Sequence, residues 1–341
     1  MRRNITIDVL KGLLILFVVL GHCLQYGYGI DYYSRGSYYD DYLFRAIYCF
    51  HMPLFMFISG YLFYYSNKKA LSYVLKSKVL TIGIPFFVYC SVLFVLWYKI
   101  HHINTFYFSS YLWGFKSHLW FLSSLLLYCI IVALTTKVHE SSSIYPICVL
   151  IAVCVSFLFV SDEFINGTHK YVFIFFLLGF FLNSNCGAIV KKLKNPVVFL
   201  FLTSMFVMSV IVNDSKMMIY EGGYCIISDG QISYKQLYTD IIRFTIGVVS
   251  SCWFVVVVSY FSKVKIFESV FAYLGKQTLA VYGMQSVLFS ILSEYNYYWN
   301  LPHYYSISFL LCIGVLLVCE FFIFIFNRNR VFKLMFLGKM T

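Results

Sequence analysis

The sequence predicts an all-α fold, a polytopic bundle of about ten transmembrane helices whose N- and C-termini both face the cytoplasm. Three observations support this. Of the 341 residues, 61% are hydrophobic and only 12% are charged, and the mean hydropathy is +0.80. Apolar stretches of about 20 residues, the length that crosses a bilayer, recur along the chain. Lys and Arg cluster between these stretches, as they do in cytoplasmic loops. Such a composition leaves no room for a large soluble domain.

The ten candidate spans follow one another from the N-terminus almost to the end of the chain. Each is a predominantly apolar run that fits the thickness of a bilayer. They cover residues 6–26, 43–64, 79–98, 119–136, 143–160, 171–185, 197–212, 238–262, 277–292 and 305–326. Together they predict a single membrane domain over residues 1–341, with no separate soluble domain.

The distribution of charge predicts the topology. With a cytoplasmic N-terminus, the inside segments carry sixteen Lys and Arg residues and the outside segments carry six. This positive-inside bias accounts for the net charge of +12, so we expect no nucleic-acid partner. Nine of the eleven cysteines lie inside apolar stretches and no C-x-x-C pair occurs, which argues against a disulfide framework or a metal site.

The first span carries polar residues along one face. A helix advances 100° per residue, so Lys11 and His22 fall within roughly 20° of each other, and Asp8 and Gln25 lie close to the same line. The four residues form one polar stripe, with His22 about 16 Å beyond Lys11. Ionisable groups at membrane depth are costly and are candidates for function. The alternative for a histidine in a bundle is a structural hydrogen bond.

Other polar side chains in or near the spans are candidates for acceptor binding or for lining a path. They are Arg45, His51, Ser59, His118 and Trp120. Each has a plainer interpretation, since Trp anchors helices at interfaces and Ser59 with Gly60 permits close helix packing. Glu320, Asp240 and Arg243 are further buried-charge candidates, and the last two, three residues apart, could pair with each other.

Two kinds of chemistry fit such a set of residues. Asp, Lys and His inside a membrane are suited to a proton relay in a transporter. They are equally suited to group transfer, in which His removes the proton of an acceptor hydroxyl. Outer loops at 27–42 and 213–236, rich in Tyr, Asp, Gly and Ser, resemble a sugar-binding surface but also ordinary interfacial tyrosines. Spacing alone leaves these alternatives open.

Several sequence blocks resemble the acyltransferase-3 family of integral membrane O-acyltransferases, in its sugar and fucose O-acetylase-like branch. The first is RNITIDVLKGLLILFVVLGH, with the family's Asp, basic residue and, after ten intervening residues, His. The others are FHMPLFMFISGYLF at 50–63, KSKVLTIGIPFFVY at 76–89, HLWFL at 118–122 and LGKQTLAVYGMQ at 274–285. The blocks span most of the chain in the family's order.

The resemblance implies a membrane O-acetyltransferase of a bacterial inner membrane. Acetyl-CoA would be a co-substrate, with no bound cofactor, and the acceptor would be a hydroxyl of a cell-surface or lipid-linked glycan such as O-antigen, capsule or exopolysaccharide. His22 matches the essential histidine and would act as general base or transient acyl carrier, with Asp8 beside it. Lys11, helped by Lys76 and Lys78, would bind the acyl donor.

Two departures from the family pattern stand out. Many relatives end the block at 274–285 with His, whereas this chain has Gln285, to which we assign no proton-transfer role. Lys replaces Arg at position 11, which keeps the charge but loses bidentate geometry.

The alternative hypothesis is a transporter or polymerase of lipid-linked sugars that uses the buried charges as a proton path or sugar clamp. A non-catalytic scaffold would explain the topology but not the stripe. Membrane lipids are partners in each case.

Overall fold

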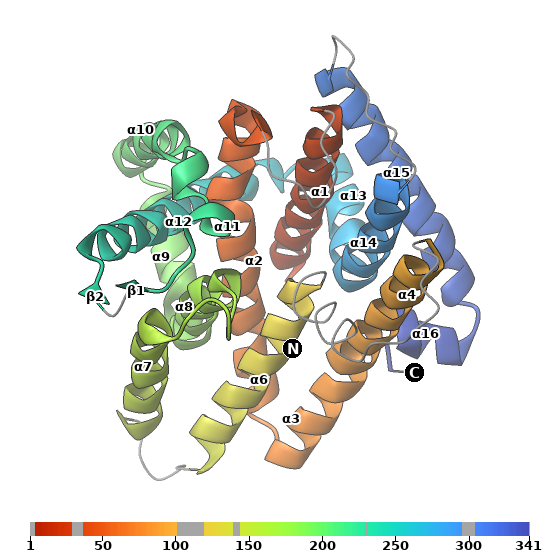
Figure 1. The fold of residues 1–341 in the computed structure, drawn as a ribbon, viewed down its shortest axis with the longest axis horizontal. Coiled ribbons are helices and arrows are strands. Elements are labelled where there is room, and N and C mark those ends of the chain that lie inside the picture. The colour runs from red at the N-terminus through yellow and green to blue at the C-terminus, as the bar shows by residue number, and fades with distance from the viewer. Residues whose placement is uncertain are drawn as a thin grey trace. The chain divides into compact units, whose positions relative to one another are not determined.

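The computed structural model describes residues 4–28, 37–100, 119–138, 144–228, 231–294 and 304–340 (Figure 1). In it the chain forms two compact units. Unit 1 contains residues 1–44, 77–123 and 264–341, and unit 2 contains residues 45–76 and 124–263. Each unit is built almost entirely of helices, which confirms the all-α membrane fold.

Each of the ten predicted spans coincides with a helix or with a bent pair of helices. Six helices in the described ranges are long and apolar enough to cross a membrane, and the bent pair Gly167–Phe181 with Asn183–Leu193 is a seventh candidate. The other three segments form shorter apolar helices, Ile144–Phe159, Pro196–Val212 and Thr278–Ser293. The orientation of the termini stays a prediction.

Unit 1 is organised around the N-terminal helix α1. The side chain of Asn4 accepts a hydrogen bond from the Thr6 N–H and caps α1 at its start. The unit contains α1 (Ile5–Gly27), α4 (Ile84–Ile100), α13 (Lys265–Gly275), α14 (Thr278–Glu294), α15 (Tyr304–Phe326) and α16 (Arg330–Leu337), the 3-10 turn Ser37–Asp40 and the π-helical turn Val79–Gly83.

Two glycines let α13 pack tightly on α1. A Cβ atom at Gly12 would lie 2.0 Å from the carbonyl oxygen of Phe271, and one at Gly275 would lie 1.8 Å from the carbonyl oxygen of Asp8. Only glycine permits such close approach of two backbones. The pairs 12–271 and 8–275 show that α13 runs antiparallel to α1. The chain then reverses, and α14 runs beside α1 (Figure 1).

Unit 2 surrounds the second predicted span. Its helices are α2 (Tyr42–Asn67), α3 (Leu71–Lys78), α6 (Trp120–Val138), α7 (Ile144–Phe159), α8 (Gly167–Phe181), α9 (Cys186–Leu193), α10 (Pro196–Val212), α11 (Ile219–Gly222) and α12 (Tyr234–Phe261). One end of each of α2, α3 and α6 belongs to unit 1. Two short antiparallel strands, β1 (Ile227–Ser228) and β2 (Gln231–Ile232), pair beside α12.

Unit 2 repeats the close packing seen in unit 1. A Cβ at Gly60 of α2 would lie 1.9 Å from the Phe176 carbonyl oxygen, and one at Gly179 of α8 would lie 1.9 Å from that of Phe57. The Ser59-Gly60 pair thus serves the packing role that was its plainer interpretation. Beyond Gly179 the chain bends by 62° at Asn183–Asn185 and continues as α9, which explains why the sixth predicted span is short.

Candidate functional site

The polar stripe predicted for the first span lies on one continuous helix. No break interrupts α1 between Asp8 and Gln25, so the 100° periodicity that places these side chains on one face applies throughout. Asp8 and Gln25 are buried, while Lys11 and His22 are half-buried. The stripe therefore faces protein for most of its length, as polar groups in a membrane domain are expected to do.

The histidine end of the stripe packs against α14. Nδ1 of His22 lies 3.1 Å from Oε1 of Gln25, and the His22 ring meets the edge of Phe289 with centroids 5.6 Å apart. Tyr26 stacks on the same Phe289 and donates its hydroxyl to the Phe289 carbonyl at 2.7 Å. Because a phenol has one proton, Ser293 donates in its 2.5 Å contact with Tyr26.

The hydrogen bond to Gln25 fixes the tautomer of a neutral His22. An amide oxygen can only accept, so the imidazole carries its proton on Nδ1. The lone pair is then on Nε2, which makes Nε2 the atom able to accept a proton from a substrate.

The other end of the stripe lies where α13 joins α14. Asp8 touches Gly275 through its backbone, and Lys276 and Gln277 follow directly. Lys339, beyond the end of α16, donates from Nζ to Oε1 of Gln277 at 2.7 Å. Lys276 and Lys339 were not predicted as site residues, because no local sequence pattern shows that residue 339 lies beside residue 277.

The two ends establish a parallel register between α1 and α14. Gly275 meets Asp8 and Phe289 meets His22, and the separation is fourteen residues on both segments. Gln285, four residues before Phe289 on α14, therefore lies one turn closer than Phe289 to the Lys11 end of α1. Gln285 is fully buried.

Other predicted site residues of unit 1 lie on other helices. Lys78 is half-buried at the end of α3, and Trp120 is half-buried at the start of α6. That start is docked on α14, because the Phe121 N–H donates to the Tyr282 hydroxyl at 3.4 Å. His118 lies outside the described residues. Their roles in donor or acceptor binding stay predictions.

The remaining predicted residues belong to unit 2. His51 is buried on α2, and its Nδ1 donates to the Ile47 carbonyl at 2.9 Å. Ser59 donates to the Phe55 carbonyl of its own helix at 2.8 Å. Arg45 is half-buried and Lys76 is exposed. The structure thus gives His51 and Ser59 local hydrogen bonds within α2, and their contacts with an acceptor stay predictions.

The suggested pairing of Asp240 with Arg243 is confirmed. Arg243 Nη1 donates to Asp240 Oδ1 at 2.8 Å, and both side chains are buried. The guanidinium also donates to carbonyls of the segment between α10 and β1: Lys216, Met217, Met218 and Gly223. This pair therefore holds the predicted outer loop onto α12.

A neighbouring ion pair was not predicted. Lys170, one of the six basic residues counted in the predicted outside segments, is fully buried, pairs with Asp162 and donates to the Val160 carbonyl. Asp162 also accepts from the Tyr224 N–H at 2.8 Å. Burial, reinforced by the charge of Asp240, raises the pKa of the Tyr224 phenol, which is therefore neutral. These contacts stabilise the same loop.

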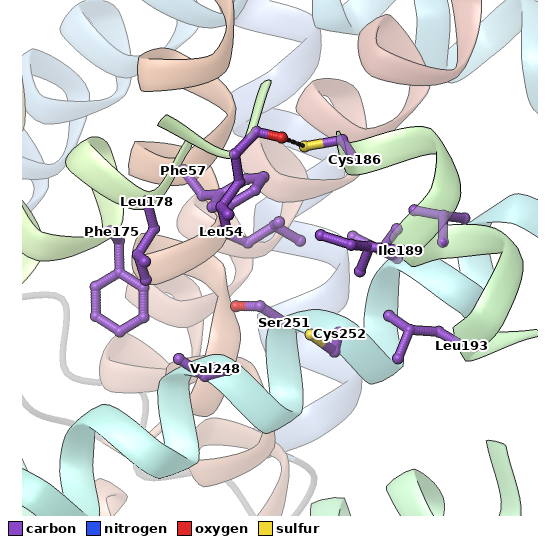
Figure 2. Close-up of a pocket in the computed structure, with 13 residues that line it drawn as sticks. Leu54, Phe57, Phe175, Leu178, Cys186, Ile189, Leu193, Val248, Ser251 and Cys252 are labelled. Atoms are coloured by element: carbon purple, nitrogen blue, oxygen red, sulfur yellow. Dashed lines mark hydrogen bonds between the residues drawn. The ribbon is translucent and has the colours of Figure 1, made fainter. Parts of the chain in front are cut away.

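Unit 2 also contains an apolar cavity of about 150 Å³ between α2, α8, α9 and α12 (Figure 2). Its walls are almost entirely aliphatic and aromatic, and the dashed line in Figure 2 marks the bond from the Cys186 thiol to the Leu182 carbonyl. Its lining residues include Ser251, Cys186 and Cys252 but no histidine, lysine or carboxylate that could serve as a general base or bind a charged donor. The polar stripe of unit 1 is therefore the stronger candidate site.

The sequence resembles known proteins in part of its length and matches one family model over most of it. The chain is similar over part of its length to the nodulation protein NolL of two bacteria, with 53% identity over 60 residues for Sinorhizobium fredii (strain NBRC 101917 / NGR234) and 34% over 95 residues for Mesorhizobium japonicum (strain LMG 29417 / CECT 9101 / MAFF 303099). These stretches cover 18% and 28% of this chain but only 16% and 25% of the relatives. No solved structure matches significantly. The family model described as "Acyltransferase domain" matches residues 4–324. The chain therefore belongs to the acyltransferase-3 family of membrane acyltransferases.

Proposed function

We propose that this protein transfers an acetyl group from cytoplasmic acetyl-CoA to a hydroxyl of an extracytoplasmic glycan, with His22 as general base. Membership of the family supports acyl transfer. The observation that carries the assignment to His22 is its hydrogen bond to Gln25, which leaves Nε2 free of a proton in the neutral ring. That nitrogen belongs to a stripe that also contains the cation Lys11 on the same helix.

The proposed reaction needs one base and one leaving group. Nε2 of His22 takes the proton of the glycan hydroxyl as its oxygen attacks the thioester carbonyl carbon. The C–O bond forms, the C–S bond breaks and the coenzyme A sulfur leaves with the electron pair. The imidazolium then returns its proton to that sulfur, which regenerates the neutral ring. A transient acyl-His22 would give the same products in two steps.

The donor would enter from the Asp8 end of the stripe. Lys11 lies about 16 Å along the helix from His22, a gap for the arm of a donor to bridge rather than for a direct contact. Lys276 and Lys339 lie at the same end of α1 through Gly275 and Gln277. These cations would attract the phosphates of coenzyme A.

The acceptor would approach from the other end of α1. Tyr28, just after α1, donates to Asp41 at 3.1 Å, and Tyr305 of α15 also donates to that carboxylate. Phenols and a carboxylate at this end are groups that stack on sugar rings and accept from sugar hydroxyls. Their position favours a glycan acceptor and supports delivery of its hydroxyl to His22.

The test is transfer of labelled acetyl from acetyl-CoA to glycan in membrane vesicles that contain the native glycan. Wild-type protein should label the glycan, and His22→Ala should reduce the rate to background while remaining folded and inserted. The matched control is Cys23→Ala, the next residue of the same helix, which should keep most of the activity. Retained transfer by His22→Ala would refute the catalytic assignment. Glycan transport without consumption of acetyl-CoA by the wild type would favour the transporter instead.

A further inference from the structure

The side chain of Gln285 has an unused hydrogen-bond acceptor inside unit 1. Its Nε2 donates to the Tyr282 carbonyl at 3.3 Å and to Ser286 Oγ at 3.2 Å. Its Oε1 is buried and has no hydrogen-bond partner among the described residues. In this orientation the NH₂ group faces the Tyr282 carbonyl, and turning the amide round would place two acceptors opposite each other. Buried acceptors in native structures nearly always accept a hydrogen bond, so we expect this oxygen to accept one from a bound ligand.

The register of α1 and α14 places this acceptor on the proposed donor route. The segment that leads into α14 starts at Gly275, which touches Asp8, and Gln285 lies between this point and Phe289. Phe289, one turn later, packs on His22. Along the axis of α14, Gln285 is about 6 Å from Phe289, toward the Lys11 end of α1.

The chemistry of the donor matches that position. In coenzyme A the thiol is joined through two methylene groups to an amide N–H, so an acyl thioester carries a hydrogen-bond donor three bonds from its sulfur. When the thioester carbon lies at His22, the amide nitrogen lies on the Lys11 side of it, and the distance between these two atoms is comparable with one helical turn. The glycan, arriving from the opposite end, presents its hydroxyl on the other side of His22.

We propose that Oε1 of Gln285 accepts a hydrogen bond from the amide N–H nearest the thioester of the acyl donor, and so positions the thioester at His22. Gln285 is a positioning residue and takes no part in proton transfer. This inference rests on the proposed function, because it assumes a coenzyme A thioester as donor. It assigns donor recognition to α14 as well as to the cations at the Asp8 end.

The experiment compares two small thioesters that differ at this amide. Full-length protein in vesicles with native glycan is supplied with S-acetyl-N-acetylcysteamine, which keeps the amide, or with S-propyl thioacetate, which lacks it. For the wild type we expect kcat/KM to be about tenfold or more higher with the amide probe. Gln285→Leu should remove this preference and raise the KM for acetyl-CoA, while the KM for glycan stays unchanged.

The conservative variant separates positioning from a structural role. A protonated Glu at position 285 keeps one carbonyl acceptor and one donor, so Gln285→Glu should retain most of the preference for the amide probe. Equal use of both thioesters by an active wild type would overturn the inference and leave the proposed function intact. So would a Gln285→Leu variant that is folded, as judged by size-exclusion chromatography, and still prefers the amide probe. Absence of transfer from acetyl-CoA by the wild type would instead overturn the proposed function.

Discussion

Nδ1 of His22 lies 3.1 Å from Oε1 of Gln25, one turn further along the same helix. This contact makes Gln25 the residue that selects the tautomer of His22. Gln25→Met keeps the length of the side chain but removes the acceptor, so the ring loses its preference for a proton on Nδ1. We expect kcat for acetyl transfer to fall roughly 10- to 100-fold, by analogy with the loss when a hydrogen-bond partner that orients a metal-bound histidine is removed. The KM values for acetyl-CoA and glycan should change little. A loss of activity that appears entirely in either KM would contradict an orienting role.

The contact of Gly275 with Asp8 predicts a strong effect of one methyl group. In Gly275→Ala the new Cβ would overlap the Asp8 carbonyl oxygen, so α13 has to move away from α1. We expect a loss of about 1–3 kcal/mol in stability, measured as a lower melting temperature in detergent. Gly314→Ala in α15 is the matched control, because nothing lies within 4 Å of its Cβ and alanine favours helix. Equal melting temperatures for the two variants would contradict the close backbone contact between α1 and α13.

Sequence periodicity predicted the helices of this fold well, because each apolar run must bury its backbone polar groups within a helix. It did not predict α13, whose eleven residues are too short to span a bilayer. What places α13 is contact with α1, through Gly12 and Gly275, and no local pattern encodes that pairing. The bend between α8 and α9 falls at the polar residues Asn183–Asn185, where the predicted sixth span ended, but the sequence did not show that a second helix continues from it.

The candidate site was predictable only in part. The spacing of Lys11, His22 and Gln25 follows from helical geometry, so one continuous α1 is enough to align them. Phe289 and Gln285 come from a helix more than 250 residues later, and only the tertiary register brings them beside α1. Lys170 was counted in an outside segment because the predicted sixth span begins at residue 171, but its side chain is buried and Asp162 compensates its charge.

Arg243 is predicted to hold the segment between α10 and β1 in place. Arg243→Gln removes several hydrogen bonds to loop carbonyls and leaves the Asp240 carboxylate buried without its cation. We expect a loss of about 3–5 kcal/mol in stability, and faster cleavage of the 213–233 segment in limited proteolysis. Arg243→Met combined with Asp240→Leu removes both charges and should recover part of the melting temperature. If the double variant is no more stable than Arg243→Gln, the loop carbonyls rather than the ion pair account for the effect.

The predicted topology places Cys225 and Cys186 on opposite sides of the membrane. Cys225 lies half-buried in the segment before β1, which the charge distribution puts outside. Cys186 begins α9, whose lysines Lys191 and Lys192 the same rule puts in the cytoplasm. A membrane-impermeant maleimide should therefore label Cys225 in intact spheroplasts and reach Cys186 only after permeabilisation.

Single-cysteine variants, in a background with the other cysteines replaced by alanine, make the comparison direct. The variant that keeps Cys225 should react to the same extent before and after permeabilisation, because its accessibility does not depend on the cytoplasmic side. The variant that keeps Cys186 supplies the control for membrane integrity. The reverse pattern would invert the assigned orientation, and with it the direction of acetyl transfer, because the Lys11 end of α1 would then face outward.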